Sequence, residues 1–284
     1  MPYSPMLKSL LARLQIALPT LLLTRLAGLL AEARVGWLKN SMIRLFSMVY
    51  HIDWEEIEAD RAADFASFNE FFCRPLRAGT RPFTPAAAQL LSPCDGRIGA
   101  CGVIGSSQQL LQAKGIDYPL PRLLACAAEH SNHLLGQHYY TLYLAPHNYH
   151  RVHMPLTGSL QHSRHLPGRL FSVAPASSAA LPGIFCRNER VVCWFADQQQ
   201  RPWVMVLVGA MMVGSITSVW HGRYQHRSSA ARQHTGLSPP VQLDQGDEMG
   251  RFLLGSTVIV IAPQPPAPGL ATGATIRLHQ ALSA

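Results

Sequence analysis

Leucines repeat at helical spacing in the first part of the chain. Within residues 7–14 they follow the i, i+3, i+4, i+7 pattern of one helix face, and Leu22, Leu26, Leu29 and Leu30 follow the related pattern i, i+4, i+7, i+8. Pro19 and Thr20 lie between the two runs, where a helix boundary is expected. The pattern therefore predicts two amphipathic helices. Their apolar faces either pack on the rest of the protein or lie in a membrane interface, and this region alone favours neither alternative.

Acidic residues replace the leucines in residues 53–70. Seven acidic side chains accompany a single base, Arg61, which predicts a third helix with a solvated acidic face. Residues 71–85 then carry three arginines and three prolines, so we expect an extended connection there.

From about residue 89 onward the pattern changes to short apolar runs broken by glycine and proline. These runs are rich in valine, isoleucine and aromatic residues, which favours strands. They lie at residues 139–144, 190–195, 204–208 and 257–261, with a last strand near 275–278. The uncharged stretch 203–220 is long enough to cross a membrane. Its glycines, serines and valines favour two buried strands joined at Gly209 or Gly214 instead.

These patterns predict an α+β fold with two parts. Residues 1–70 would form a helical region suited to membrane association, and residues 71–284 a mainly β domain. The 284 residues are 48% hydrophobic and only 14% charged, which excludes a disordered chain. The net charge of +8 is uneven, with +5 in residues 1–50, −6 in 51–70, +3 in 71–84 and +6 in the remainder. This uneven distribution argues against a nucleic-acid partner.

Lysine is scarce, which bears on the cofactor. Lys8, Lys39 and Lys114 are the only lysines among 24 basic residues. Pyridoxal phosphate enzymes hold their cofactor on a lysine, and two of these three lie in the helical region, so that cofactor is not expected. The six cysteines form no CxxC pair, which favours reduced thiols over a metal site.

Three short motifs carry candidate chemistry. They are S-P-C-D-G-R at residues 92–97, H-N-Y-H-R-V-H at 147–153 and L-G-S-T at 254–257. The three histidines suggest a metal cluster, but on a straight strand they would point to alternate faces, and no further ligands are evident. Asp, His and Ser together suggest a hydrolase. However, Ser256 is not in a G-x-S-x-G turn, and the start of an apolar strand suits attack on an external substrate poorly.

The motifs also occur in the order found in one protein family. The chain resembles phosphatidylserine decarboxylases of the bacterial, membrane-associated, pyruvoyl-dependent type. Further blocks that carry the resemblance are K-G at 114–115, Y-H-R-V-H-M-P at 149–155, P-G at 167–168, N-E-R at 188–190, V-G-A-M-M-V-G-S-I at 208–216 and the stretch 246–257. Together the blocks span residues 68–260, and the basic, leucine-rich N-terminus resembles the family's as well.

The resemblance implies that the chain is a zymogen that cuts itself. Ser256 would attack the carbonyl of Gly255, giving a β chain of residues 1–255 and an α chain of residues 256–284 that begins with a pyruvoyl group. His153 would act as the base, Asp95 would orient it, and His150 would protonate or position the substrate. The pyruvoyl carbonyl would form a Schiff base with the amine of phosphatidylserine, which yields phosphatidylethanolamine and CO₂. Neither pyridoxal phosphate nor a metal is implied.

The resemblance further implies a location and partners. We expect peripheral association with the cytoplasmic side of the cell membrane, contact with an anionic membrane surface, continued association of the α and β chains, and a homodimer. Asn148 departs from the family, because well-known bacterial members have Asp there. Asn forms hydrogen bonds but carries no charge, so processing or turnover would be slower if that Asp raises the basicity of the histidine. Asp95 is present, so we expect activity to be retained.

Two alternatives to an active decarboxylase stay open. One is a relative that binds lipid but has lost activity. The other is a serine hydrolase that uses Asp95, His153 and Ser256 on an external ester.

Overall fold

The computed structural model describes residue 15 and residues 20–113, 115–211, 215–224, 232–235, 240–253 and 256–284. The helices are α2 (Thr20–Glu32), α3 (Gly36–Tyr50), η1 (Ala62–Asp64), α4 (Phe68–Phe72), α5 (Leu120–Leu124), η2 (Ala128–Leu134), α6 (Pro175–Ser178) and α7 (Ile184–Arg187). The first strands are β1 (Gly96–Val103), β2 (Gln109–Ala113), β3 (Ile116–Pro119), β4 (His138–Leu144), β5 (Arg151–His153), β6 (Gly158–Leu166), β7 (Arg190–Ala196) and β8 (Pro202–Gly209). The remaining strands are β9 (Ile216–Ser218), β10 (Gly222–Arg223), β11 (Arg232–Thr235), β12 (Gln242–Leu243), β13 (Glu248–Phe252), β14 (Ser256–Ala262) and β15 (Thr275–Ile276).

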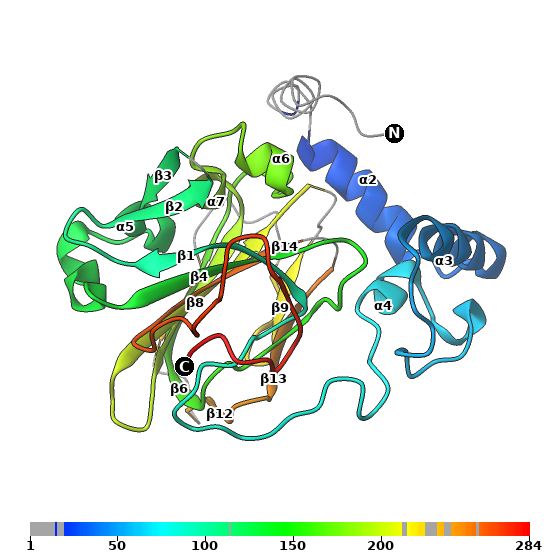
Figure 1. Ribbon diagram of the computed structural model, residues 1–284. Helices are drawn as coiled ribbons and strands as arrows, with labels where there is room; N and C mark the ends of the chain where they lie inside the picture. Colours follow the sequence, from blue (N-terminus) through cyan, green and yellow to red (C-terminus); the bar gives the residue numbers. More distant parts are fainter. Residues whose placement is uncertain are drawn as a thin grey trace.

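Nine of the described strands form one sheet. Its order is β11, β6, β7, β8, β14, β4, β1 and β15, with β12 also paired to β6. A second sheet has the order β10, β9, β13 and β5, and β2 pairs with β3. Figure 1 shows α2, α3 and α4 beside these sheets rather than among their strands. Helices followed by a mainly β domain confirm the predicted α+β fold.

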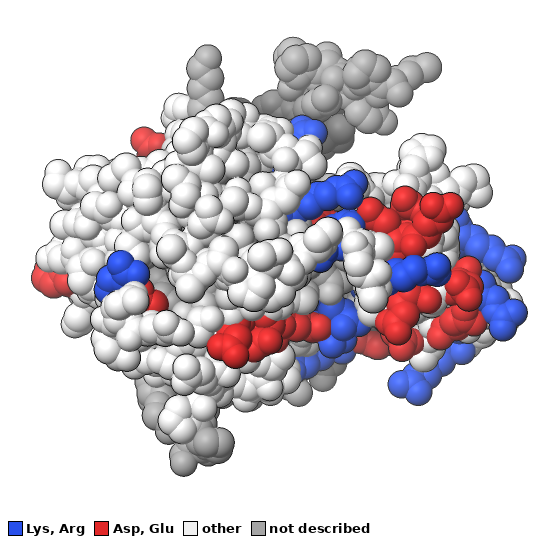
Figure 2. All heavy atoms as spheres, turned by 60° about the horizontal axis from the view of Figure 1, so that its bottom comes forward, with Lys and Arg blue, Asp and Glu red and all other residues white. Residues whose placement is uncertain are grey.

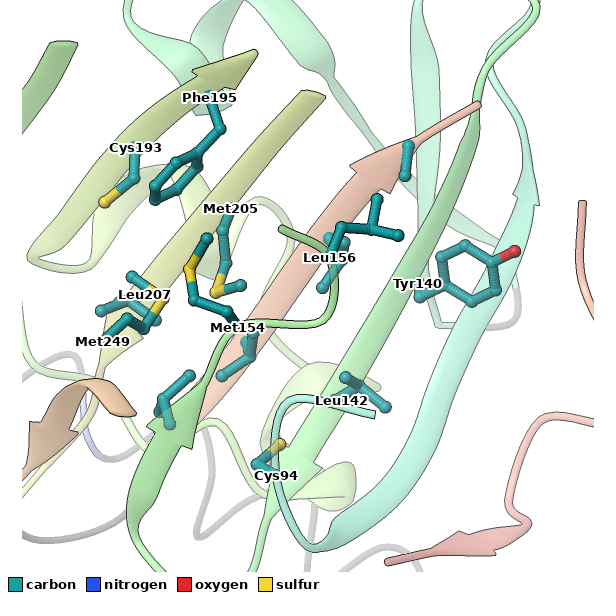
Figure 3. Packing of buried hydrophobic residues seen from close by; sticks show 14 of the residues in the cluster. Cys94, Tyr140, Leu142, Met154, Leu156, Cys193, Phe195, Met205, Leu207 and Met249 are labelled. Atoms are coloured by element: carbon teal, nitrogen blue, oxygen red, sulfur yellow. The ribbon is translucent and has the colours of Figure 1, made fainter. Parts of the chain in front are cut away.

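The central strands of the large sheet are buried on both faces. Successive side chains of a strand point to opposite faces, so Met205 and Leu207 of β8 lie in one core and Val206 in another. Figure 3 shows Met154, Met205 and Leu207 together in the first of these cores. Burial on both faces explains why the strands at 139–144, 190–195, 204–208 and 257–261 are so uniformly apolar in sequence.

The predicted helix at residues 53–70 is wrong. The structure has turns there, with a β-bridge between Ile57 and Leu76 and only the short elements η1 and α4 in helical form. Asp53 accepts a hydrogen bond from the amide of Glu55, a local turn that aspartate favours. Ile57 and Phe65 are anchored in a small core by tertiary packing, which the charge pattern did not reveal.

The remaining predictions concern the two leucine runs and the uncharged stretch 203–220. The second leucine run forms α2, whereas the first, residues 7–14, lies outside the described residues. The helix α3 was not predicted. The stretch 203–220 contains β8 and β9, as expected for two buried strands. Within the described ranges, no helix combines the length and the apolar character needed to cross a bilayer.

Candidate active site

The strand register brings the predicted residues to one end of the large sheet. Ser256 begins β14 and pairs with Leu144, the last residue of β4. Arg97 of β1 pairs with Tyr143 of β4, so the turn that carries Asp95 lies at the same end. Because neighbouring strands are about 4.8 Å apart, two strand spacings of roughly 10 Å separate the backbones of β1 and β14 there.

Ser256 is fully buried in the structure. Its hydroxyl has no hydrogen-bond partner within the described part of the chain. The alternation of β14 places its side chain on the same face as Val258 and Val260, which belong to the first core. Leu254 and Gly255, including the predicted cleavage bond, lie outside the described residues. The hydroxyl of the next residue, Thr257, is also buried without a partner in the described part of the chain, so this feature alone does not set Ser256 apart.

The two predicted histidines lie beside the chain that leads into Ser256. His150 and His153 flank Val152, whose side chain packs in the first core. Strand β5 pairs with β13, and the amide of Phe252 donates to the carbonyl of His150 at 3.0 Å. Pairing of β5 with β13 therefore places His150 beside Phe252, four residues before Ser256, and His153 opposite Glu248.

His153 is held by two neighbours through its ring nitrogens. Nδ1 lies 2.8 Å from the carbonyl of Gly246, and Nε2 lies 3.1 Å from the hydroxyl of Tyr149. A carbonyl only accepts, so Nδ1 carries the proton and Nε2 accepts from Tyr149. Burial lowers the pKa of His153 and raises the pKa of Tyr149 to about 12. The result is a neutral imidazole with an unprotonated Nε2, the form that a general base requires.

Asp95 is bound by arginine. The guanidinium of Arg81 donates to its carboxylate at 2.6 to 3.2 Å, and the amide of Leu278 donates at 2.8 Å. The second edge of Arg81 binds Glu56 at 2.8 and 3.0 Å. The turn before Asp95 is tied to His153, whose amide donates to the carbonyl of Pro93. The ring nitrogens of His153 thus contact Tyr149 and Gly246 and not Asp95. The orienting role of Asp95 therefore stays a prediction.

His150 is the most deeply buried ionisable group of the site. Its ring stacks on Phe72 with centroids 4.1 Å apart, and Nε2 lies 3.3 Å from the carbonyl of Pro146. Burial, followed by the charge of Arg74, lowers the pKa of His150 to about 3. It is therefore neutral in the free protein near neutral pH.

Asn148 stabilises the loop between β4 and β5. Its Oδ1 accepts from the amide of Ala145 at 2.7 Å. A carboxylate oxygen would accept the same bond, so this contact does not require the amide. His147 contributes its backbone carbonyl, which accepts from Arg74 at 2.8 Å.

Sequence reasoning missed several residues around His153. Tyr149 could have been found from the sequence, because it directly precedes His150 in the motif at residues 149–155. Arg81 and Gly246 come from distant segments without a motif of their own. His279 is also distant in sequence, yet its ring packs edge-on against His153 with centroids 5.7 Å apart. These contacts depend on tertiary packing.

Metal ligation and disulfides do not feature in the described structure. No group of three or more His, Cys, Asp or Glu side chains there is arranged to hold a metal ion. All six cysteines are free, and four of them are buried.

Comparison with known proteins identifies the family. The family model described as phosphatidylserine decarboxylase matches residues 68–284, and one described as PSD matches residues 10–51. The phosphatidylserine decarboxylase proenzyme of Azoarcus sp. (strain BH72) is 48% identical over 88% of this chain and 86% of its own length. Proenzymes of the same name from Albidiferax ferrireducens and Yersinia enterocolitica are 44% and 43% identical, over 95% and 98% of this chain and 95% and 97% of their own lengths. The chain belongs to the phosphatidylserine decarboxylase family.

Proposed function

We propose that the chain is a self-processing enzyme that converts phosphatidylserine to phosphatidylethanolamine and CO₂. Family membership supports the substrate and the reaction. The observation that carries self-processing is the position of Ser256. Its hydroxyl is fully buried, lacks a partner among the described residues, and follows directly on the peptide bond from Gly255. Such a hydroxyl is poorly placed to attack an external ester but adjoins a carbonyl of its own chain.

The first reaction would convert a peptide bond to an ester. The Oγ of Ser256 would give its proton to Nε2 of His153, in place of the Tyr149 hydroxyl from which this nitrogen accepts in the structure, and would attack the carbonyl carbon of Gly255. The carbon–nitrogen bond then breaks and the nitrogen takes up a proton. A positioned general base contributes about 10²–10⁴ in rate to such a step. Loss of the Cα proton of residue 256 expels the carboxylate of Gly255, and hydrolysis with loss of ammonia leaves the pyruvoyl group.

The cut protein would stay together because the shorter chain is built into the sheet. Strand β14 lies between β8 and β4. The amide of Leu278, near the end of the α chain, donates to Asp95 of the β chain. Strand pairing on both sides of β14 does not depend on the bond to Gly255.

The pyruvoyl group fits a position that is buried and lacks competing partners. Once formed, it supplies a carbonyl that accepts the substrate amine and the electron pair left by CO₂. His150 adjoins the chain entering residue 256 through its contact with Phe252. We assign His150 either to holding the proton that is needed after CO₂ has left or to positioning the substrate.

Membrane association is part of the proposal and is supported by α3. Trp37, Leu45, Met48 and Val49 recur at i, i+8, i+11 and i+12 and leave an apolar face exposed. Figure 2 shows charged side chains gathered on the side of the molecule where α3 and α4 lie. The charged side chains there are of both signs, so it is the exposed apolar face of α3 that suits a membrane interface. We infer peripheral binding at the cytoplasmic side of the cell membrane, and a homodimer belongs to the same proposal.

Intact mass spectrometry tests self-processing. The purified protein should yield two chains, residues 1–255 and 256–284, with a carbonyl at the start of the shorter one. Ser256→Ala should remain a single chain and lack decarboxylase activity. Ser163→Ala, which alters another buried strand serine, is the matched control and should be cut. A folded but uncut wild-type protein would contradict the proposal, and labelling by a serine-reactive phosphonate without cleavage would favour a hydrolase.

A further inference from the structure

Arg74 is a buried arginine that forms no ion pair with an acidic side chain in the described part of the chain. The residue is 4% exposed, and only its Nη2 forms a hydrogen bond, to the carbonyl of His147. Its Nε and Nη1 have no partner among the residues that the structure describes. The ring of Phe71 lies 5.3 Å from its Cζ, a cation–π contact that supplies no conventional hydrogen-bond acceptor. Burial lowers the pKa of Arg74 to about 10, so the group is still charged near neutral pH.

The neighbouring Arg81 lines the same cavity, but its guanidinium group has a full set of hydrogen-bond partners. Its two edges bind Asp95 and Glu56, and every guanidinium nitrogen has a partner. Arg277 also approaches Glu56, at 3.4 Å. Two nearby carboxylates are thus engaged by other arginines, whereas Arg74 retains two free donors. A buried charge with unsatisfied donors is costly unless an anion completes it.

Arg74 lines a cavity of about 250 Å³ between the helical region and the β domain. From the helical side the cavity is lined by His51 and Ile52, which directly follow α3. From the β domain it is lined by Asp95 and Tyr149 of the site described above. The cavity thus runs from the end of the exposed apolar helix to Asp95, and Asp53 and Glu56 also line it, so it offers carboxylates to an ammonium group as well as the guanidinium of Arg74 to an oxyanion. Its volume is below that of a typical drug-sized pocket, which suits a headgroup better than a whole lipid.

We propose that Arg74 binds an oxyanion of the phosphatidylserine headgroup in this cavity. A guanidinium presents parallel N–H groups that match the paired oxygens of a phosphate or carboxylate. Free phosphate shares this chemistry, and the experiment must separate the two sources. The identity of the ligand rests on the proposed function, whereas the need for an anion rests on the buried donors.

A bound oxyanion would also act on His150. The charge of Arg74 is, after burial, the next cause that lowers the pKa of His150. An anion on Arg74 would offset part of that charge and make a protonated His150 less unfavourable. Headgroup binding and proton delivery would then be linked through one arginine.

Kinetics of Arg74→Met and Arg74→Lys test the proposal, with Arg97→Met as the matched control. Arg97 is exposed and lies on β1 at the same end of the sheet. Rates are taken per cleaved enzyme, counted by mass spectrometry, with phosphatidylserine in mixed micelles. Loss of a charge-assisted contact should raise KM by about ten- to a hundredfold in Arg74→Met. Arg74→Lys should recover part of that loss, and the control should stay within about twofold. An unchanged KM in Arg74→Met would overturn the proposal.

Thermal unfolding provides a second test that needs no turnover. Glycerophosphoserine should raise the unfolding midpoint of the wild type and not that of Arg74→Met. Removing an unpaired buried charge should leave the ligand-free midpoint of Arg74→Met equal or higher, whereas a purely structural role would lower it. Inorganic phosphate that raises the wild-type midpoint as much as equimolar glycerophosphoserine would overturn the headgroup assignment. Failure of self-cleavage in the wild type would contradict the proposed function and leave this binding test intact.

Discussion

Strand β14 and helix α3 are both apolar, yet only the strand is covered. All seven residues of β14 are buried, because β8 and β4 flank it and a core lies on each face. In α3 only Lys39 and Ile43 are buried, and Trp37 is 75% exposed. Burial fixes Ser256 at the start of β14, whereas exposure leaves α3 with a surface that only a partner would cover. An apolar sequence pattern thus predicts a strand or helix but does not indicate whether the protein itself or a partner covers its apolar face.

The largest expected effect is on stability in the covered region. Ile259→Ala removes a fully buried side chain from β14 and should lower the free energy of unfolding by about 2–5 kcal/mol. Leu45→Ala, the matched truncation on the exposed face of α3, should change it by less than about 0.5 kcal/mol. Urea unfolding in the uncut Ser256→Ala background measures both on one chain. Equal losses would show that α3 is covered by the protein itself.

A second effect concerns acid stability of the covered site. The pKa of His150 is lowered to about 3 from its ordinary 6.5, so the unfolded chain binds more protons between these values. The contribution of His150 is complete above pH 6.5 and declines as the pH falls toward 3. It amounts to roughly 3 kcal/mol between pH 6.5 and 4.

Urea unfolding at several pH values measures this contribution. His150→Gln in the Ser256→Ala background should lose less stability on acidification than its parent. His130→Gln alters an exposed histidine and is the control. Parallel stability curves for His150→Gln and its parent would contradict burial of a neutral His150.

The same contrast explains which parts of the fold were predictable. The strands at 139–144 and 257–261 were found within about one residue because burial on two faces leaves an uninterrupted apolar run. The helix α3 was missed because Lys39 is buried and apolar residues such as Leu45 are exposed, which inverts the usual pattern. The acidic helix failed because Ile57 pairs with Leu76 across a turn, a tertiary contact that charge does not encode.

The site was predictable to the extent that its residues lie in motifs. Asp95 and Ser256 lie at one end of the sheet because β1, β4 and β14 are neighbours in register, and hydrogen bonds tie His153 to Pro93 and His150 to Phe252. The hydrogen bonds among them were not predictable. Arg81 binds Asp95, and the carbonyl of Gly246 binds His153, through segments that only the folded chain brings close. The roles assigned to these residues stay predictions.

A smaller effect should follow from loss of the hydroxyl beside His153. Tyr149 donates to Nε2, a bond that only the neutral imidazole with an unprotonated Nε2 can accept. Tyr149→Phe should slow self-cleavage about five- to tenfold, as expected for one hydrogen bond. The pH at which cleavage is half-maximal should also rise, because the pKa of His153 rises when the donor is lost.

The rate of self-cleavage as a function of pH provides the measurement for Tyr149. Tyr140→Phe is the control, because that hydroxyl binds the carbonyl of Gln264 instead. A reduced rate with an unmoved pH midpoint would indicate that Tyr149 serves packing alone.

The smallest effect on the folded protein, and the one that most sharpens the comparison, is expected on α3. Trp37→Ser and Met48→Ser should each leave the free energy of unfolding within about 0.5 kcal/mol of the parent, because both side chains are exposed. If the face lies in a membrane, each should weaken binding to anionic vesicles about tenfold, since burial of such a side chain is worth about 1.5–3 kcal/mol. Val103→Ser changes an exposed apolar residue in the β domain and should bind as the parent does. Co-sedimentation at low salt distinguishes the outcomes, and unchanged binding of both α3 variants would remove the membrane from the proposal and leave a protein partner as the occupant of that face.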